Sequence, residues 1–250
     1  MRITGLTMDI IWKEPEANFR KIERELKGIE TDLVLLPEMF STGFCMQVED
    51  IADNKNETLH WMQSLAKARN IAIAGSVSVA ERGLFYNRFY FIYPNGAYLF
   101  YDKRHLFSYS GEDKIYSKGK DRMIVEYLGV RFLLLVCYDL RFPVFSRNKG
   151  DYDVILYVAN WPQARINAWH SLLKARAIEN LSYVFGLNRI GTDGNNLYYE
   201  ESSNCFFADG SIVSRKEGSQ VIAEIDLQKL KAFREKYGFL NDADDFQILI

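Results

Sequence analysis

The sequence predicts a layered α/β fold, in which helices cover sheets whose strands are largely buried. Segments with a strand pattern alternate along the chain with segments in which apolar residues recur every three or four positions. Two runs, 33–36 and 132–136, are apolar at every position, as is typical of strands covered on both faces. The chain has 250 residues, 48% of them hydrophobic and 14% aromatic, which is enough for a core of two layers or more.

The first two elements are a strand within residues 1–11 and a helix that begins at Pro15. Proline suits a first helical position, because the N–H group that it lacks would have no acceptor there. The helix has one apolar face and can stop near Gly28; the apolar residues at helical spacing are Phe19, Ile22, Leu26 and Ile29.

A buried strand at 33–36 follows, and Pro37 ends its pairing, so Glu38 stands just beyond the strand tip. Asn56 is expected to cap a second helix, because its side chain can accept a hydrogen bond from the first turn. Residues 71–79 are expected to form the next strand.

A hairpin is expected from strands at 84–93 and 97–102, because Pro94-Asn95-Gly96 between them is a strong turn signal. The segment 101–119 that follows is polar, contains glycine and has no repeating pattern. We interpret it as a functional loop.

The second half of the chain repeats the alternation of strands and helices. The strand at 132–136 ends at Cys137, where the chain is expected to surface into a turn and a helix. The remaining expected elements are strands at 153–159 and from Tyr183, a helix with Ile166, Trp169, Leu173, Ala177 and Leu181 on one face, closing strands at 204–214 and 220–226 around Asp209-Gly210, and a last helix from Leu227 to Gly238.

We interpret residues 1–250 as a single domain, because no stretch has the composition of a linker. Its C-terminal tail, 239–250, is expected to dock on this domain or on a partner subunit. An apolar terminus left in water is unfavourable, and this tail finishes on Phe246, Ile248, Leu249 and Ile250.

Charge and cysteine content exclude several classes of function. The 31 basic and 33 acidic residues are interspersed, so no basic stripe predicts a nucleic-acid partner. No apolar run approaches the roughly 18 residues of a membrane-spanning helix and no signal peptide is evident, so we expect no membrane partner and a cytoplasmic location. Three cysteines are too few for a disulfide framework, and without clustered Cys and His ligands neither a metal nor another cofactor is expected.

Cys137 is the first candidate for catalysis. A thiol at the end of a buried strand is presented by the turn instead of being packed in the core. The alternative is a small buried apolar residue, which is what most unpaired cysteines are. A nucleophilic cysteine requires a base or a positive neighbour, and commonly a donor for the oxyanion that forms.

Glu38 and Lys103 fit these requirements better than any histidine. Glu38 follows one buried strand as Cys137 follows another, and Lys103 opens the polar loop. Each has a structural alternative, because Glu38 can solvate a turn and Lys103 can be an ordinary surface lysine. A Cys–His dyad has little support, since the histidines lie in amphipathic helices or beside apolar residues: His60, His105 and His170.

Three segments, in this order, resemble the catalytic motifs of the nitrilase superfamily of carbon–nitrogen hydrolases: LLPEMF, DKRHLF and CYDLRFP. Further similar segments extend the resemblance over roughly residues 1–235: NRFYFIYPNG, YSKG, NWPQAR, LLKARAIEN and NRIGTDGN. The lysine motif of the family is K-x-H-L, which assigns the catalytic role to Lys103 and not to Arg104 or Lys114.

The resemblance implies a four-layer α-β-β-α sandwich of two mixed sheets, with subunits that pair through their helical layers. A homodimer or a higher homo-oligomer is therefore expected. The combination of CYDLRFP, NRIGTDGN and a short chain is most similar to the omega-amidase-like branch. Members of that branch hydrolyse the terminal amide of α-keto acid amides such as 2-oxoglutaramate and 2-oxosuccinamate, so a small-molecule amide is the expected substrate.

The resemblance also implies roles for individual residues. Glu38 is the general base that takes the proton of the nucleophile Cys137, and Lys103 holds the oxyanion together with the backbone N–H of Tyr138. Glu112 resembles the family's second glutamate, which orients the lysine and assists proton transfer. The alternative for Glu112 is a solvated loop carboxylate.

Further residues are candidates for the substrate pocket. Arg141 either binds a substrate carboxylate or pairs within the protein and pins the turn, and we prefer the internal pair. Phe44 and Trp161 are expected to line the pocket with Tyr138, although aromatic side chains are often core residues. Glu201-Ser202-Ser203 replaces the Gly-Asp-Ser that is usual in the family, which leaves the role of that loop open.

Other functions remain open at this point. The same chemistry could act on an N-carbamoyl amine, a nitrile or a modified peptide amide. A catalytically silent member of the family, acting as a binding subunit, is a third possibility. The presence of all three triad residues argues against that last interpretation.

Overall fold

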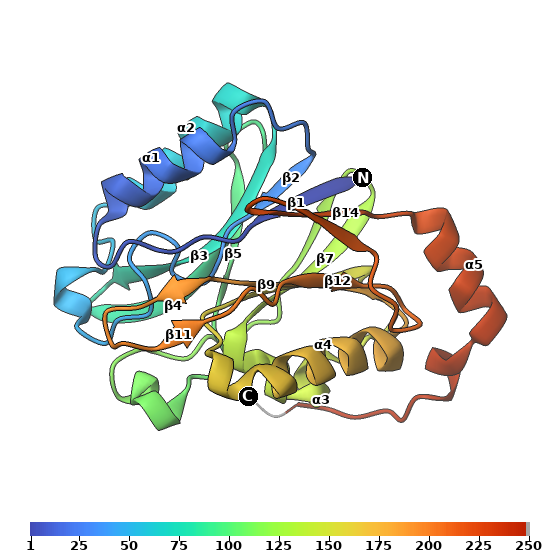
Figure 1. Cartoon of the computed structure of the whole chain (residues 1–250). Coiled ribbons are helices and arrows are strands. Elements are labelled where there is room, and N and C mark those ends of the chain that lie inside the picture. The colour runs from blue at the N-terminus through green and yellow to red at the C-terminus, as the bar shows by residue number, and fades with distance from the viewer. Residues whose placement is uncertain (249–250) are drawn as a thin grey trace.

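The computed structural model describes residues 1–248 and contains two mixed sheets that pack face to face (Figure 1). Helices α1 (Pro15–Glu25) and α2 (Glu57–Arg69) cover the outer face of one sheet. Helices α3 (Pro143–Ser146) and α4 (Ile166–Asn180) cover the outer face of the other. The four-layer α-β-β-α sandwich that the resemblance implies is therefore confirmed. Helix α5 (Leu227–Tyr237) lies beside the layers, and Gly238 follows it as expected.

The larger sheet has seven strands in the order β13-β14-β1-β2-β3-β4-β5. Strands β1, β2 and β3 run parallel in its centre, and the flanking strands pair antiparallel. Their bounds are β1 Arg2–Leu6, β2 Leu33–Leu35, β3 Ala72–Glu81, β4 Leu84–Ile92, β5 Tyr98–Asp102, β13 Ser214–Glu217 and β14 Gln220–Glu224.

The smaller sheet has five strands in the order β12-β9-β8-β7-β6. Strands β7, β8 and β9 are parallel, with Val136 of β7 opposite Val158 of β8, and the two edge strands are antiparallel. The bounds are β6 Ile124–Tyr127, β7 Val130–Val136, β8 Val154–Ala159, β9 Tyr183–Asn188 and β12 Asn204–Phe206. A separate two-stranded ribbon joins β10 (Gly191–Thr192) and β11 (Tyr198–Tyr199).

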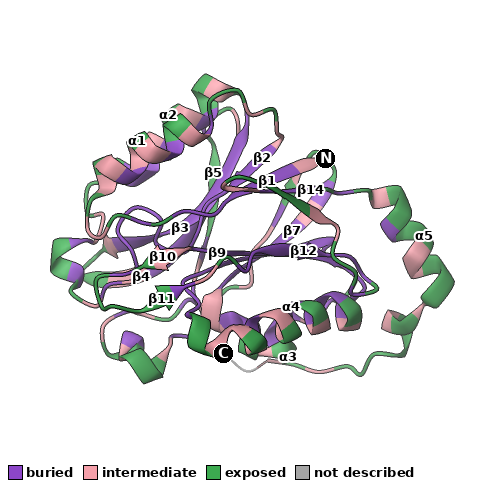
Figure 2. Ribbon diagram, in the orientation of Figure 1, coloured by how far each residue is buried: buried purple, intermediate pink, exposed green. Residues whose placement is uncertain are grey.

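The central strands β2 and β8 are apolar and buried at every position because both of their faces are covered, and Figure 2 shows the buried strands of the two sheets between the helices. In and just beyond β2, Leu33 and Leu35 pack in the core between the sheets, whereas Val34 and Leu36 pack under α1 and α2. The sheets approach closely at Gly5, where an added Cβ would lie 2.8 Å from the Leu187 side chain. Successive residues of such a strand thus face the core between the sheets and the core under the helices in turn, which explains why the runs at 33–36 and 132–136 lack polar residues.

The parallel strands bring their carboxyl ends to one edge of the sandwich. Glu38 lies three residues after β2, Cys137 directly follows β7, and Asn160 directly follows β8. Because β7 and β8 are adjacent, Cys137 and Asn160 lie side by side. The crevice outside the carboxyl ends of such strands is where layered α/β proteins bind ligands.

The expected strand at 204–214 is wrong as a single element. Its two ends belong to different sheets, because β12 pairs with β9 whereas β13 pairs with β14. A tight turn separates them: Gly210 has φ +81°, and Asp209 accepts a hydrogen bond from the Ser211 backbone N–H. The turn lets the chain cross from one sheet to the other. The edge strand β6 was not expected from the sequence.

Asn56 occupies the expected position before α2 but does not cap it. Its backbone is left-handed, with φ +60°, and its side chain makes no capping hydrogen bond. Asp53 caps instead, accepting hydrogen bonds from the backbone N–H groups of Glu57 and Thr58 at 2.9 Å each. A carboxylate at a helix N-terminus also interacts favourably with the helix dipole.

Short 3₁₀ helices occupy several connections. The helix expected after Cys137 is the 3₁₀ helix η4 (Cys137–Arg141), followed by the single turn of α3. The segment interpreted as a loop contains η2 (Ser108–Ser110) and η3 (Glu112–Lys114). The others are η1 (Val48–Asp50), η5 (Gln163–Arg165) and η6 (Phe239–Asp242).

The tail contacts the five-stranded half of the molecule. Lys149 donates a hydrogen bond to the backbone carbonyl of Phe246 at 3.1 Å and lies over its ring, and Ile248 packs against the main core. The expected docking of Leu249 and Ile250 lies outside the described residues. Within 1–248, no helix has the length and apolar character required to cross a membrane.

Candidate active site

Cys137 stands at a strained strand-to-helix turn. Its φ is +46°, a left-handed conformation that residues other than glycine rarely adopt. Strain of this kind persists where the surrounding structure imposes it, often at active sites. The thiol lines a cavity, and its Sγ lies 3.9 Å from the backbone carbonyl oxygen of Asn160. The turn therefore presents the sulfur and does not bury it in the core.

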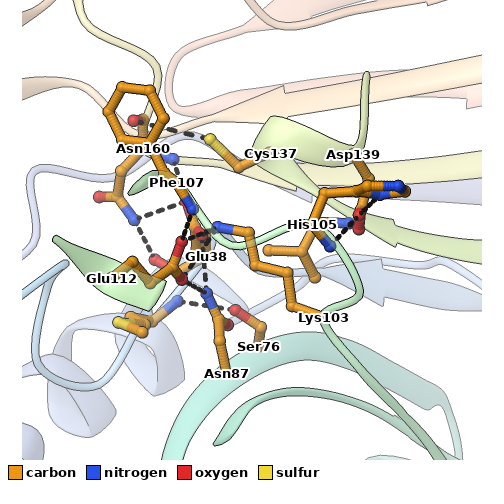
Figure 3. Close-up of polar contacts among 12 residues, drawn as sticks. Glu38, Ser76, Asn87, Lys103, His105, Phe107, Glu112, Cys137, Asp139 and Asn160 are labelled. Atoms are coloured by element: carbon orange, nitrogen blue, oxygen red, sulfur yellow. Dashed lines mark hydrogen bonds and ion pairs between the residues drawn. The ribbon is translucent and has the colours of Figure 1, made fainter. Parts of the chain in front are cut away.

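Asp139 anchors this turn. One oxygen of its buried carboxylate accepts hydrogen bonds from the Val136 backbone N–H and the Tyr101 hydroxyl, both at 2.9 Å. The other accepts the His105 backbone N–H at 3.0 Å and lies 2.7 Å from His105 Nδ1 (Figure 3). Asp139 thereby ties the end of β7 to the segment that begins with Lys103.

The preferred interpretation, in which Arg141 forms an internal pair that pins the turn, is wrong. Asp139 pins the turn instead. Among residues 1–248, no carboxylate forms an ion pair with Arg141. Its side chain is exposed to the cavity, and its guanidinium lies over the Trp161 ring, 5.0 Å from the ring centroid.

Glu38, Lys103 and Glu112 form a buried cluster. Lys103 Nζ lies 3.0 Å from Glu38 Oε1 and 2.9 and 3.1 Å from the two oxygens of Glu112 (Figure 3). All three side chains are fully buried from solvent. Glu38 and Lys103 line the cavity with Cys137, whereas Glu112 lies behind Lys103 and does not line it. The structure thus brings together the four residues expected to carry the chemistry.

Two asparagines that the sequence analysis did not select hold the carboxylates in place. Asn87 donates to Glu38 at 2.8 Å and to Glu112 at 3.3 Å. The Asn160 backbone N–H donates to Glu38 Oε2 at 2.8 Å, and its side-chain amide donates to the Glu38 carbonyl at 2.7 Å. Asn160 follows a buried strand, which is the signal that identified Glu38 and Cys137. Asn87 interrupts an otherwise largely apolar stretch of β4, a weaker signal.

Burial and charge set the ionisation of the cluster. Burial alone would lower the pKa of Lys103, but the Glu112 and Glu38 carboxylates outweigh it and raise the pKa. Burial raises the pKa of Glu112. Glu112 nevertheless has only N–H donors as hydrogen-bond partners: Lys103, Asn87 and the Phe107 backbone. A carboxyl group that only accepts hydrogen bonds has the pattern of an ionised carboxylate. Lys103 is therefore a cation that contacts the ionised Glu112 and, on its other side, the Glu38 side chain.

The surroundings of Cys137 favour the protonated thiol. Burial among protein atoms raises its pKa well above the ordinary value, and the nearby Glu38 charge raises it further, while Lys103 opposes this. A thiol in this state is a poor nucleophile until a base removes its proton. Glu38 is the neighbouring carboxylate that faces the same cavity.

The cavity next to Cys137 has a volume of about 270 Å³. That volume is below the usual range of pockets for drug-sized ligands, so the site suits a small molecule. All the residues expected to line it do so: Phe44, Tyr138, Arg141 and Trp161. Residues of the β10–β11 ribbon also line the cavity, among them Asp193, Asn195, Leu197 and Tyr199.

Tyr138 is the second residue of η4, and the first N–H groups of a helix have no acceptor within the helix. Its backbone N–H is therefore in a position to bind a developing negative charge beside Cys137. The Tyr138 ring packs against Phe107 and Phe142, with centroids 5.0 and 5.1 Å apart.

The segment Glu201-Ser202-Ser203 acts behind the cavity wall. Ser202 Oγ accepts a hydrogen bond from the Asn188 side chain at 3.0 Å, and Asn188 in turn exchanges two hydrogen bonds of 2.8 Å with the Trp161 backbone. This segment therefore braces Trp161, and Ser202 and Ser203 are buried. Glu201 forms an ion pair with Lys216 at the surface.

No set of three or more His, Cys, Asp or Glu side chains within residues 1–248 is arranged to hold a metal ion. The cluster at the site instead combines a thiol, a carboxylate and a buried cation, which together can perform nucleophilic and acid–base chemistry. The absence of a cofactor stays a prediction.

Comparison with known proteins identifies the family. The sequence profile of the carbon-nitrogen hydrolase family matches residues 2–235. The chain belongs to the carbon–nitrogen hydrolase family. The resemblance of its three motifs to this family is thereby confirmed, and so is its interpretation as a hydrolase of carbon–nitrogen bonds.

Individual carbon–nitrogen hydrolases are similar over their whole length. The omega-amidase YafV of Escherichia coli (strain K12) is 43% identical over 252 residues, which cover 99% of this chain and 98% of the relative. The 2-oxoglutaramate amidase of Bacillus subtilis (strain 168) is 34% identical and covers 96% of each chain. The crystal structure of XC1258 from Xanthomonas campestris, a CN-hydrolase superfamily protein with an arsenic adduct in its active site, has a TM-score of 0.95 at 37% identity. It covers 99% of this chain and 98% of its own.

Proposed function

We propose that this protein is an amidase that hydrolyses the terminal amide of a small α-keto acid amide, such as 2-oxoglutaramate or 2-oxosuccinamate. The observation that carries the proposal is the convergence of Cys137, Glu38 and Lys103 on one small cavity. The similarity to the omega-amidase and the 2-oxoglutaramate amidase supports this substrate class.

The first half of the reaction forms a thioester. Glu38 takes the proton of the Cys137 thiol, and the sulfur attacks the amide carbon. The oxygen of the tetrahedral intermediate accepts hydrogen bonds from Lys103 and from the Tyr138 backbone N–H. A fixed donor at such an oxyanion is worth about 3 kcal/mol in comparable sites. Because the pKa of Cys137 is raised, little thiolate forms unless a base removes the proton, which is the proposed role of Glu38.

The intermediate then collapses, and the carbon–nitrogen bond breaks as Glu38 returns the proton to the departing ammonia. The acyl group remains on Cys137 as a thioester. Glu38 next removes a proton from water, whose oxygen attacks the thioester carbonyl, and the keto acid leaves as the thiol is restored. Each cycle consumes one amide and one water and releases one ammonia and one keto acid.

Glu112 has a positioning role in this proposal. It accepts two hydrogen bonds from Lys103 and lies behind it, so it fixes the ammonium group and compensates part of its charge. Asn87 donates hydrogen bonds to both Glu112 and Glu38 and so holds the two carboxyl groups in place around Lys103.

Arg141 places a positive charge at the wall of the cavity. Its guanidinium has the planar, forked geometry that binds a carboxylate through two hydrogen bonds. A keto acid amide carries a carboxylate at the end remote from the amide, so Arg141 is the proposed binding group for that end. The rings of Phe44, Trp161 and Tyr138 enclose the chain between the two ends.

A homodimer or a higher homo-oligomer and a cytoplasmic location also belong to this proposal. The resemblance implies pairing through the helical layers, and Val144 of α3 and Ile178 of α4 expose apolar side chains there. All three cysteines are free thiols, which suits a reducing compartment.

A substrate panel tests the proposed function. Release of ammonia and of carbon dioxide is measured with 2-oxoglutaramate, an N-carbamoyl amine, an aliphatic nitrile and a peptide amide. The proposal expects 2-oxoglutaramate to give the highest kcat/KM, with ammonia and no carbon dioxide. Because 2-oxoglutaramate cyclises, the assay is repeated at a pH that populates the open form. Preference for the carbamoyl compound with both gases released, or no turnover of any amide, would contradict it.

A further inference from the structure

The cavity is lined by two arginines, of which only Arg141 was selected as a candidate site residue from the sequence. The second is Arg165, the last residue of η5. Its guanidinium lies 5.1 Å from the centroid of the Phe107 ring, just as Arg141 lies 5.0 Å from that of Trp161. Each guanidinium is thus steadied by the face of an aromatic ring that also lines the cavity.

Among the described residues 1–248, the guanidinium groups of both arginines lack an acidic partner. Within residues 1–248 the ion pairs of the chain include neither Arg141 nor Arg165. The acids of the cavity wall are already engaged. Glu38 pairs with Lys103, and Asp193 accepts hydrogen bonds from two backbone N–H groups and from the Tyr199 hydroxyl. In the part of the chain that the structure describes, neither of these two acidic side chains forms an ion pair with Arg141 or Arg165.

Arg165 is held by its backbone and not by its side chain. Its carbonyl oxygen accepts a hydrogen bond from Trp161 Nε1 at 2.8 Å, which fixes the start of its side chain beside the cavity wall. Phe107, on which the guanidinium rests, is itself fixed, because its N–H donates to Glu112 at 2.6 Å. The side chain thereby lines the cavity, and it forms no hydrogen bond with any residue that the structure describes.

Two unpaired cations in a cavity of about 270 Å³ repel one another, and a bound anion relieves this repulsion. A carboxylate has two oxygens and about four acceptor sites, so one carboxylate can accept from two guanidinium groups. We infer that Arg165 is a second specificity-determining residue, which binds the remote carboxylate of the substrate together with Arg141. The inference rests on the proposed function and names the group in the substrate that this site selects.

The test compares two amides of equal length that differ only at the remote end. Glutaramate ends in a carboxylate and pentanamide ends in a methyl group, and neither carries the 2-oxo group that lets 2-oxoglutaramate cyclise. In Arg165→Gln, kcat/KM for glutaramate is expected to fall about 10- to 100-fold, the range for a lost hydrogen bond to a charged group. The value for pentanamide is expected to stay within about twofold. Arg165→Lys keeps the charge but not the fork and should recover part of the loss.

Two further variants sharpen the result. Arg20→Gln removes the same charge from an exposed position on α1 and should change neither amide. In the Arg141→Gln, Arg165→Gln double variant, the loss on glutaramate should differ from the product of the single losses, because both residues contact one carboxylate. Equal losses on both amides, or no loss on glutaramate in Arg165→Gln, would overturn the inference.

Failure of the proposed function is recognised separately. If the wild type turns over no amide at all, the proposed function fails. Calorimetric binding of 2-oxoglutarate still decides whether Arg165 is an anion site. The wild type should bind this product at least tenfold more tightly than Arg165→Gln. Equal affinity would overturn the inference independently of turnover.

Discussion

Lys103 is the residue on which the charge balance of the site depends. Its ammonium group is fully buried between two carboxylates, and its pKa is raised by them. Removing one partner of such a group leaves uncompensated buried charge, which typically costs 3–5 kcal/mol. Lys103 therefore contributes to the stability of the fold as well as to the proposed oxyanion site.

Replacing this lysine is expected to affect both properties. Lys103→Met should abolish ammonia release and lower the free energy of unfolding by about 3–5 kcal/mol, because Glu38 and Glu112 would face each other without a cation. Urea unfolding and an ammonia assay measure the two effects. Lys114→Met is the matched control, since Lys114 is exposed in the same segment. A Lys103→Met protein of unchanged stability would contradict the charge balance described here.

The pH dependence of Cys137 alkylation follows from its raised pKa. A free thiol has a pKa of about 8.5, so its alkylation rate levels off near pH 9 to 10. Because burial raises the pKa of Cys137 further, the iodoacetamide rate should still be rising at pH 10. The rate is followed by mass spectrometry of the peptide that contains Cys137. A plateau below pH 8 would show a stable thiolate and contradict this.

Among the elements, the turn after β7 and the segment after β5 depend on one carboxylate. Asp139 accepts from β7, from Tyr101 and from His105. Asp139→Asn puts an amide N–H group against hydrogen-bond donors. We expect a loss of about 2–3 kcal/mol in unfolding free energy and a fall in kcat larger than any rise in KM. Asp121→Asn, at an exposed position, is the control. Wild-type kcat in Asp139→Asn would refute this coupling.

Strand tips were predictable from the sequence, whereas contacts across elements were not. The apolar runs ending before Glu38 and Cys137 marked both residues, because a strand covered on both faces must become polar where it surfaces. The contacts of Asn87 come from residues 38 and 112, far along the chain, so no local pattern identified it. The strand expected at 204–214 failed because its Asp209-Gly210 turn joins two different sheets.

For the whole molecule, the four layers were predictable only through the family resemblance. The alternation of elements predicted a layered α/β fold, but it does not distinguish one sheet with helices on both faces from two sheets packed together. The edge strand β6 has only four residues, of which Val125 alone is buried, so its pattern is weak. The roles of the four clustered residues stay predictions, although the structure brings their side chains together.

The folded molecule should lose stability at alkaline pH. Burial raises the pKa of Tyr90 and Tyr183 to about 12, and raises those of Tyr101 and Tyr152 well above the ordinary value. The folded state holds these tyrosine protons more tightly than the unfolded chain does. Its stability therefore falls as the pH rises above the ordinary tyrosine pKa, near 10, towards the raised pKa of the folded state. Urea unfolding between pH 7.5 and 11 should show a falling free energy above about pH 9.5. A constant value to pH 11 would be inconsistent with these buried tyrosines.

The most direct test of the account is ammonia release from 2-oxoglutaramate by Cys137→Ala, with Cys205→Ala as the matched control. Cys205 is a free, fully buried thiol on β12 and lines no part of the cavity. We expect Cys137→Ala to keep the wild-type melting temperature and to lose about 10³-fold or more in kcat, while Cys205→Ala stays within a few fold of the wild type. Activity of Cys137→Ala within tenfold of the wild type would contradict thioester catalysis by Cys137.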